Sequence, residues 1–497
     1  MTSSRTLSPA LSAVFLSLAS PLLGQDAKAA SAALPQGAEA PKKAAEPKPW
    51  RLNSALGGPS WLTVSGEQRS RYETLNHQFR RPSGANPPYA GQDDVLALRT
   101  SVRIDAKGDT LGGTVEILDS RQYGMQTDSF VDTTMVNTSD VLQAFGSAQL
   151  GELGDGKHEL RVGREAIDLG NRRLVARNAF RNTINAFDGA DWLWSSKDVS
   201  VRAFWLMPVE RRPSVPPSTP TPQQTDPLRN NEFEFDNQDL DTQFAGFYGT
   251  KKWNDTDGVD VYVLGLDENG AGTRMRELIT VGSRLFVNCG VNTQPIQRDG
   301  AWFYEVEATS QFGESKTSAT ASTISDHEAW FVHASLGYAF DAPWKPAVQV
   351  AYDYASGDRS NTDGKNNRFD TLYGARRWEY GPTGIWGAIA RANLDSPELR
   401  LLLQPASHVN FMVAVRGVWL AEERDAWTAG GLRDATGASG THVGEQIEAR
   451  IRWDVLPKSF DIEVGFATLL EGSFQDRASG GQGEDATYGY LQTTFRF

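Results

Sequence analysis

The densest group of side chains with chemical potential lies between residues 161 and 191, where arginines recur with no lysine among them. They are Arg161, Arg164, Arg172, Arg173, Arg177 and Arg181. Arginine presents a planar fork of N–H donors that suits bidentate contact with carboxylates, and it stays charged at any working pH. The interspersed Asp168, Asp188 and Asp191 have the charge to hold these guanidinium groups in fixed orientations. We predict a selectivity zone for a carboxylated solute, with mutual pairing of these charges around a polar interior as the alternative.

The elements that must position these arginines are strands, because the sequence alternates apolar and polar residues with a period of two. In residues 95–106, Leu96, Leu98 and Ile104 share one face, and Arg99 and Arg103 share the other. The same alternation marks the segments 61–74, 140–150, 199–205, 301–308 and several later ones. Strands are therefore expected to fill most of the chain.

Three features favour a membrane barrel over a soluble β-sandwich or β-helix. The chain ends in TYGYLQTTFRF, with the aromatic Phe497 as its last residue, a pattern typical of outer-membrane proteins. Short turns alternate with long connections such as 211–241 and 356–383, as in barrels with tight inner turns and long outer loops. Aromatic residues recur near strand ends, as two interfacial girdles require: Trp302, Trp330, Tyr338, Tyr352, Tyr354, Trp419 and Trp453.

The predicted fold class is therefore all-β, a transmembrane antiparallel up-and-down β-barrel of roughly 16 to 18 strands. A barrel of this size has a lumen too wide for wall side chains to fill, so it is a pore unless loops plug it. An arginine on the lipid face near the midplane costs about 2–4 kcal/mol, so the wall arginines must point inward. This reasoning applies to Arg69, Arg71, Arg99, Arg103 and Arg202.

The chain divides into three predicted regions. Residues 1–29 have the layout of a secretory signal peptide, with Arg5 before an apolar stretch and small residues after it. Residues 30–49, rich in Ala, Pro and Lys, are predicted to be a disordered linker. Residues 50–497 have a uniform texture and are predicted to form the outer-membrane barrel. No later apolar run reaches the roughly 18 residues that a spanning helix needs.

Several other classes of function are disfavoured. The formal net charge of −13 argues against nucleic-acid binding. The single cysteine allows no internal disulfide, and the six histidines lack metal-ligand spacing. Asp358, Asp363 and Asp370 form a weak calcium candidate, since outer turns use the same residue types. No GxSxG elbow or catalytic triad is evident, and nothing marks Glu305 and Glu307 as a catalytic pair, so neither an enzyme nor a cofactor is expected.

Several longer segments together resemble the alginate-export family of outer-membrane β-barrel porins. They are VGREAIDLGNRRLVARNAFRNTINAFDGADW, GEQRSRYE, YDYASGDRSNTDGKNNRFDTLYG and HVGEQIEARIRWDVLPKSFDIEVGFATLLEGSF. The resemblance runs from about Trp61 to the C-terminus. It implies an 18-stranded barrel with an electropositive constriction that conducts an anionic polyuronate outward. The pore residues it implies are Arg69, Arg71, Arg99, Arg103, Arg161, Arg164, Arg172, Arg173, Arg177 and Arg181.

The sequence therefore predicts an outer-membrane porin of a Gram-negative-type bacterium that passes an anionic polysaccharide or oligosaccharide. Its expected partners are that saccharide, outer-membrane lipid, and the barrel-assembly machinery through the strand that ends at Phe497. Replacing Arg172, Arg173 and Arg177 by alanine is expected to weaken anion preference. Two alternatives stay open: an uptake porin for small organic acids or other solutes, and an outer-membrane hydrolase or adhesin whose barrel is only an anchor.

Overall fold

The computed structural model of this chain describes most of the predicted barrel region. The described residues are 51–80, 89, 91–126, 128–214, 226–270, 273–289, 300–360, 362–481 and 483–497. The predicted signal peptide and linker lie outside the described residues.

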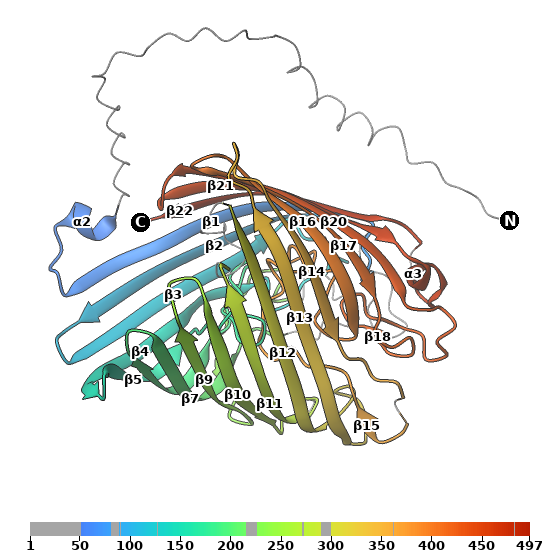
Figure 1. The fold of residues 1–497 in the computed structure, drawn as a ribbon, viewed down its shortest axis with the longest axis horizontal. Coiled ribbons are helices and arrows are strands. Elements are labelled where there is room, and N and C mark those ends of the chain that lie inside the picture. The colour runs from blue at the N-terminus through green and yellow to red at the C-terminus, as the bar shows by residue number, and fades with distance from the viewer. Residues whose placement is uncertain are drawn as a thin grey trace, which may run out of the picture. The chain divides into compact units, whose positions relative to one another are not determined.

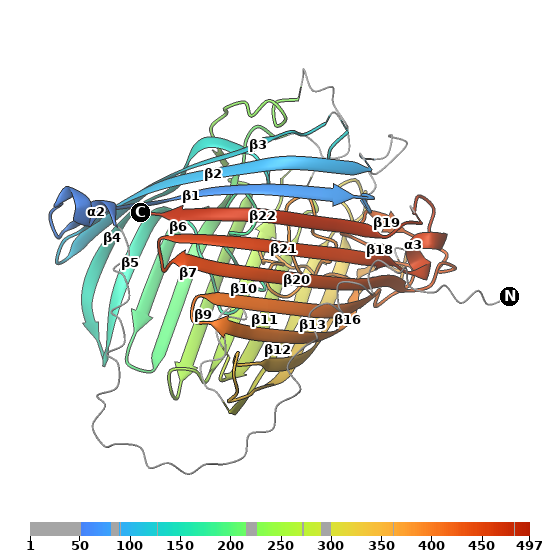
Figure 2. The same ribbon diagram turned by 90° about the horizontal axis from the view of Figure 1, so that it is seen from above.

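The described part of the chain is a closed antiparallel β-barrel of 18 strands, as predicted (Figures 1 and 2). Each barrel strand pairs with its neighbours along the chain, and β22 pairs with β1 to close the wall. The barrel strands are β1 (Leu62–Asn76), β2 (Gln92–Lys107), β3 (Leu111–Tyr123), β4 (Asn137–Leu153), β5 (Gly156–Glu165), β6 (Phe187–Ser195), β7 (Val199–Glu210), β9 (Thr242–Lys252), β10 (Gly258–Glu268), β11 (Glu277–Val287), β12 (Ala301–Ser315), β13 (Ser325–Ala339), β14 (Ala347–Ala355), β16 (Leu394–Ala406), β17 (Val409–Trp419), β20 (His442–Leu456), β21 (Phe460–Glu471) and β22 (Ala486–Arg496).

Small elements decorate the connections between these strands. They are α2 (Leu52–Leu56), β8 (Asn237–Gln238), β15 (Lys365–Asn366), β18 (Ala426–Trp427), β19 (Leu432–Arg433) and α3 (Ser473–Arg477). Neither helix in the described residues is long and apolar enough to span a bilayer.

Alternation along each strand separates an apolar outer face from a polar inner face. Val261 on β10 and Val306 on β12 are 51% and 44% exposed, whereas Asp260 and Glu305 on the opposite faces are 2% and 4% exposed. Apolar side chains outside and buried charges inside are what a barrel with a lipid-facing wall and a polar lumen requires.

In the segment 140–150 the alternation predicts that Leu142 lies on the same face as Ala144, and this prediction is wrong. The pairing of β3 with β4 shifts at this point, because Glu116 pairs with Gln143 and the next residue, Ile117, pairs with Val141. The extra residue is a β-bulge, which re-aims side chains on the bulged strand. Leu142 is consequently buried against Leu118, while Ala144 is exposed.

The two ends of the barrel differ in the length of their connections. One end has short turns, such as residues 154–155, 196–198, 407–408 and 457–459, and β1 starts and β22 finishes there. The other end has the long connections, including residues 166–186, 356–393 and 420–441. In outer-membrane barrels the short turns are periplasmic and the long loops are external. This asymmetry matches the prediction and orients the molecule.

Two of the long connections fold inward and fill much of the lumen: the short inner loop (residues 166–186) and the long inner loop (residues 362–393). They are joined by a parallel bridge between Val175 and Tyr373. The Tyr373 N–H donates to the Leu174 carbonyl at 2.9 Å, and the Ala176 N–H donates to the Tyr373 carbonyl at 3.2 Å. The loops therefore form one assembly across the barrel.

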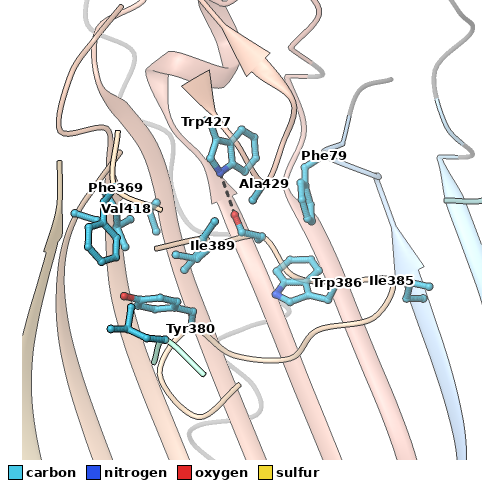
Figure 3. Packing of buried hydrophobic residues seen from close by; sticks show 14 of the residues in the cluster. Phe79, Phe369, Tyr380, Ile385, Trp386, Ile389, Val418, Trp427 and Ala429 are labelled. Carbon is cyan, nitrogen blue, oxygen red and sulfur yellow. Dashed lines mark hydrogen bonds between the residues drawn. The ribbon is translucent and has the colours of Figure 1, made fainter. Parts of the chain in front are cut away.

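Apolar side chains of the long inner loop form much of the buried core inside the barrel (Figure 3). Tyr380, Ile385 and Trp386 are at most 1% exposed. The Trp386 ring meets Phe79 edge-on at 5.2 Å, and the Trp427 indole N–H donates to the Ala388 carbonyl at 3.0 Å. The core of this barrel is thus built by loops from the long-connection end, which pack against buried side chains of the barrel strands such as Phe244 and Tyr488.

Candidate functional site

The predicted wall arginines of β1 and β2 hold the tip of the short inner loop. Arg69 donates to the Ala179 carbonyl at 2.8 Å, and Arg99 donates to the same carbonyl at 2.7 Å. Arg71 donates to the Phe180 carbonyl at 2.7 Å. Because buried carbonyls need donors, these three guanidinium groups serve as anchors for the loop.

The ring of Phe180 lies between two guanidinium groups. Arg71 from the wall is 4.3 Å from the ring centroid, and Arg377 from the long inner loop is 4.5 Å from it. Arg377 also donates to Glu448 at 2.6 Å and to the Tyr490 hydroxyl at 2.9 Å. Cation–π contacts and ion pairs together close this side of the lumen.

Arg173 is the hub that ties both inner loops to the opposite wall. Its buried guanidinium pairs with Glu305 and Glu307 on β12 and with Glu379 of the long inner loop. Arg391 of the long inner loop in turn donates to the Arg173 backbone carbonyl at 2.7 Å. The positive charge of Arg173 is thus neutralised by carboxylates of the protein itself.

Four further predicted arginines are partly exposed, and each pairs with a nearby carboxylate. The pairs are Arg103 with Asp105 (2.8 Å), Arg161 with Glu159 (2.7 Å), Arg172 with Asp168 (3.1 Å) and Arg177 with Glu116 (3.7 Å). These groups add polarity to the interior, but each has a counter-charge already in place.

Arg164 does not join the lumen group, which corrects the expectation for this residue. It lies on the same face of β5 as Val162, which is 56% exposed, and on the face opposite Arg161. Asp188 pairs with it at 2.8 Å and Asp140 lies at 3.8 Å. An ion pair close to the long-connection end of the strand satisfies its charge, so no inward orientation is needed.

The remaining predicted residue, Arg181, lines a cavity of about 550 Å³ among the long connections. We call this cavity the arginine basin. Arg80, Arg211 and Arg376 line it too, together with a single carboxylate, Asp132. The other lining residues are mainly hydroxyl, amide, aromatic and glycine residues: Tyr89, Phe130, Thr134, Asn178, Asn185, Thr371, Leu372, Tyr373, Gly374, Thr383, Gly384, Gly387, Thr428, Ala429, Gly430 and Gly431.

The four basin arginines differ from the others because their partners among the described residues are neutral acceptors. Arg211 donates to the Thr133 carbonyl at 2.7 Å, and Arg376 reaches the Gly387 carbonyl at 3.5 Å. Arg80 donates to the Ile385 carbonyl, and Arg181 donates to the Asn185 amide oxygen at 3.3 Å. Within the described part of the chain, none of the four forms an ion pair with a carboxylate.

The pKa values of the four basin arginines are lowered, mainly by burial and, at three of them, in part by the neighbouring positive charges. Burial lowers the pKa of Arg80 and of Arg181 to about 9, and the charge of Arg376 acts in the same direction on both. Burial also lowers the pKa of Arg211 and of Arg376. Asp132 opposes the lowering of the pKa at all four arginines, and Asp236 opposes it at Arg211, but two carboxylates do not balance four cations. A bound anion would relieve both the burial cost and the mutual repulsion.

Three of the basin arginines were not predicted from the sequence: Arg80, Arg211 and Arg376. Each belongs to an Arg-Arg pair in a connection between strands, at 80–81, 211–212 and 376–377, as does Arg173 at 172–173. Arginine pairs outside the strands were thus a usable signal. Which member of a pair stays without a counter-charge depends on contacts between distant loops.

The weak calcium candidate is not assembled. Asp370 is occupied by Arg274 at 2.9 Å and Arg276 at 3.1 Å, and Asp363 caps the Lys365 N–H. Asp358 lies instead next to Asp425, whose carboxylate accepts its N–H at 2.9 Å. Over the described ranges, no group of three His, Cys, Asp or Glu side chains is placed to hold a metal ion.

Solved structures with the same fold are outer-membrane channels. The crystal structure of Pseudomonas aeruginosa OpdK with vanillate has a TM-score of 0.55 at 10% identity, and the match covers 87% of this chain and 98% of that one. Pseudomonas aeruginosa OccK2 (OpdF) gives 0.53 at 11% identity, covering 88% and 97% of the two chains. Acinetobacter baumannii OccAB1 gives 0.52 at 12% identity, covering 88% and 96%. These similarities establish the barrel fold alone.

Comparison of the sequence with those of curated proteins gave no match. The alginate export family, in contrast, matches residues 60–488, which is almost the whole barrel. The chain therefore belongs to the alginate export family, whose members are β-barrels of the Gram-negative outer membrane.

Proposed function

We propose that this protein is an outer-membrane channel that passes an anionic, alginate-like polysaccharide or oligosaccharide through its lumen. The observation that carries the proposal is the arginine basin, with four guanidinium groups that form no ion pair with a described carboxylate. Arginine at such a site recognises carboxylates by charge and by its planar fork. Family membership supports the same substrate class.

The net charge of −13 does not oppose this role. Selectivity depends on the charges along the path of the solute rather than on their sum over the chain. The lumen carboxylates near this path are already held by arginines, as Glu305 is by Arg173 and Glu448 is by Arg377.

Ion selectivity in planar bilayers tests the proposal. The purified protein in a KCl gradient is expected to show a reversal potential of the sign that marks chloride preference, and polyuronate is expected to reduce the current while neutral dextran does not. Cation preference, or a current indifferent to polyuronate, would refute the proposal.

A matched pair of variants links the selectivity to the basin. Arg181→Gln is expected to reduce anion preference, because it removes one of four unneutralised charges. Arg477→Gln makes the same charge change in α3, where the side chain is exposed and outside the basin, and it is expected to leave the reversal potential unchanged. Equal effects of the two substitutions would remove the basin from the selectivity path.

Recognition of the C-terminal strand by the barrel-assembly machinery is a separate proposal. The C-terminal strand β22 ends next to Phe497, whose N–H donates to the Gly66 carbonyl at 3.1 Å. Deleting Phe497 is expected to slow membrane insertion in cells, with little effect on refolding in detergent. Loss of refolding in detergent would instead assign Phe497 a structural role.

A further inference from the structure

The arginine basin is built entirely at the long-connection end of the barrel. Its lining residues come from six connections between barrel strands, and none belongs to a barrel strand. Arg80 and Arg211 follow β1 and β7, and Arg376 lies in the long inner loop. Since long connections are external in such barrels, the basin faces the outside of the cell.

The paired inner loops close the basin on its other side. The bridge between Val175 and Tyr373 spans the lumen there, and Tyr373 itself lines the basin. A second cavity of about 420 Å³, lined by Arg161, Asp168 and Arg202, shares no lining residue with the basin. The short inner loop contributes to both cavities, through Asp168 and Arg181, whereas the long inner loop lines only the basin. The two loops therefore lie on the lumen side of the basin, and a solute reaches it from the long-connection end.

The basin has groups for recognising a sugar as well as an anion. The Thr383 hydroxyl lines it with 5% exposure and no hydrogen-bond partner among the described residues. A buried hydroxyl without a partner costs free energy that a ligand hydroxyl would recover. Tyr89 and Phe130, which meet edge-on at 5.4 Å, add an aromatic side to the cavity.

Two glycines of the long inner loop line the cavity, and one of them leaves room for a basin arginine. Gly387 has a φ of +84°, and a Cβ there would lie 3.1 Å from the Arg80 guanidinium. Gly384 has a φ of +85°, which side chains rarely adopt. A volume of about 550 Å³ lies in the range typical of pockets for small ligands, about 300–1,000 Å³, and suits a few sugar units rather than a long chain segment.

We propose that the basin is an external capture site for short uronic-acid oligomers, and that this protein takes such oligomers up from outside the cell. The inference rests on the proposed anion channel and adds the direction of entry and the size of the solute. Four guanidinium groups against one carboxylate call for a ligand with two or more negative charges, and the unpartnered Thr383 hydroxyl calls for a ligand hydroxyl.

Sidedness of channel block tests the capture site. Ser479→Cys in a Cys289→Ser background places one reactive thiol in the exposed connection before β22, so that an impermeant maleimide in one chamber reports which end faces it. Uronate oligomers of graded length are then added to either chamber. We expect short oligomers to block at lower concentration from the long-connection side. Equal potency from both sides, or block by long polymer alone, would overturn the proposal.

Binding to the purified barrel gives a second, independent readout. The double variant Arg211→Gln/Arg376→Gln is expected to weaken binding of a uronate trimer by about a hundredfold or more, because each of the two lost charged hydrogen bonds contributes about tenfold or more to the affinity. Arg477→Gln is the control and is expected to bind as the wild type does. Unchanged affinity in the double variant, or tighter binding of an aromatic monocarboxylate such as benzoate, would overturn the proposal.

The two proposals fail in different ways. If the wild-type channel prefers cations in the KCl gradient, the anion channel itself is wrong. If it prefers anions but short uronates block equally from both sides, the channel stands and the external capture site is wrong.

Discussion

Replacement of Arg173 by methionine is the sharpest test of how the inner loops are held. The guanidinium is 3% exposed and pairs with Glu305, Glu307 and Glu379. Methionine fills a similar volume but leaves buried carboxylates without their main counter-charge. Removing one partner of a buried ion pair costs about 3–5 kcal/mol, so we expect a loss of unfolding free energy in that range.

The remaining contacts of the three carboxylates limit the loss. Glu307 keeps the Tyr262 hydroxyl at 2.7 Å, Glu305 keeps Arg284 at 3.8 Å, and Glu379 keeps Arg391. The barrel wall is therefore expected to stay folded, and the inner loops are expected to lose their fixed position. We expect the conductance to rise along with the loss of stability, because Arg173 lies two residues before Val175, which bridges to the long inner loop.

Urea unfolding in lipid vesicles, followed by tryptophan fluorescence, measures the stability, and single-channel recording measures the conductance. Arg103→Met is the matched control, since its pair with Asp105 is about one-third exposed on both sides and such pairs contribute about 0–1 kcal/mol. If Arg173→Met loses no more stability than Arg103→Met and conducts like the wild type, the pairing of Arg173 with three carboxylates does not hold the inner loops in place.

Three further changes probe the wall, the loop tip and a buried carboxyl. Val306→Arg, on the outer face of β12, is expected to cost about 2–4 kcal/mol of unfolding free energy in vesicles, and a cost near zero would contradict the lipid-facing assignment. Phe180→Ala removes the ring between Arg71 and Arg377 and is expected to raise single-channel conductance, whereas Phe180→Tyr leaves it unchanged. Burial, aided by Asp425, raises the pKa of Asp358 to about 6, so the folded state binds the proton more tightly than the unfolded state. The stabilisation is complete below about pH 4 and is lost as the pH rises from about 4 to about 6. Asp358→Asn is therefore expected to reduce the change of the unfolding midpoint with pH between about pH 4 and 6.

The barrel wall was predictable because its signal is local. In β2 and β12 a period of two assigns each residue to lipid or lumen, and the cost of a charge in lipid fixes the orientation of Arg99 and Glu305. Leu142 is an exception because a β-bulge inserts one residue into β4 and shifts the period of two, and the hydrophobicity pattern does not predict that bulge.

The lumen was not predictable to the same extent, because its contacts join segments far apart in sequence. Arg69 reaches the Ala179 carbonyl 110 positions away, and Arg173 reaches Glu379 across 206 positions. Nothing in the composition of residues 166–186 shows that their carbonyls need wall arginines as donors. Predicting an arginine-rich interior was therefore possible, but assigning a role to each arginine was not.

The number of arginines in a stretch of sequence indicated the candidate binding site less well than the lack of a carboxylate partner for each arginine in the structure. Arg173 lies in the densest arginine run and is the most completely neutralised, whereas Arg80, Arg211 and Arg376 are dispersed along the chain and meet without a carboxylate partner. A charge paired within the protein stabilises the fold, and a ligand must displace its partner to use it. A charge left unpaired costs free energy until an anion arrives, and for this reason we propose the basin, rather than the arginine run, as the place where this barrel recognises a solute.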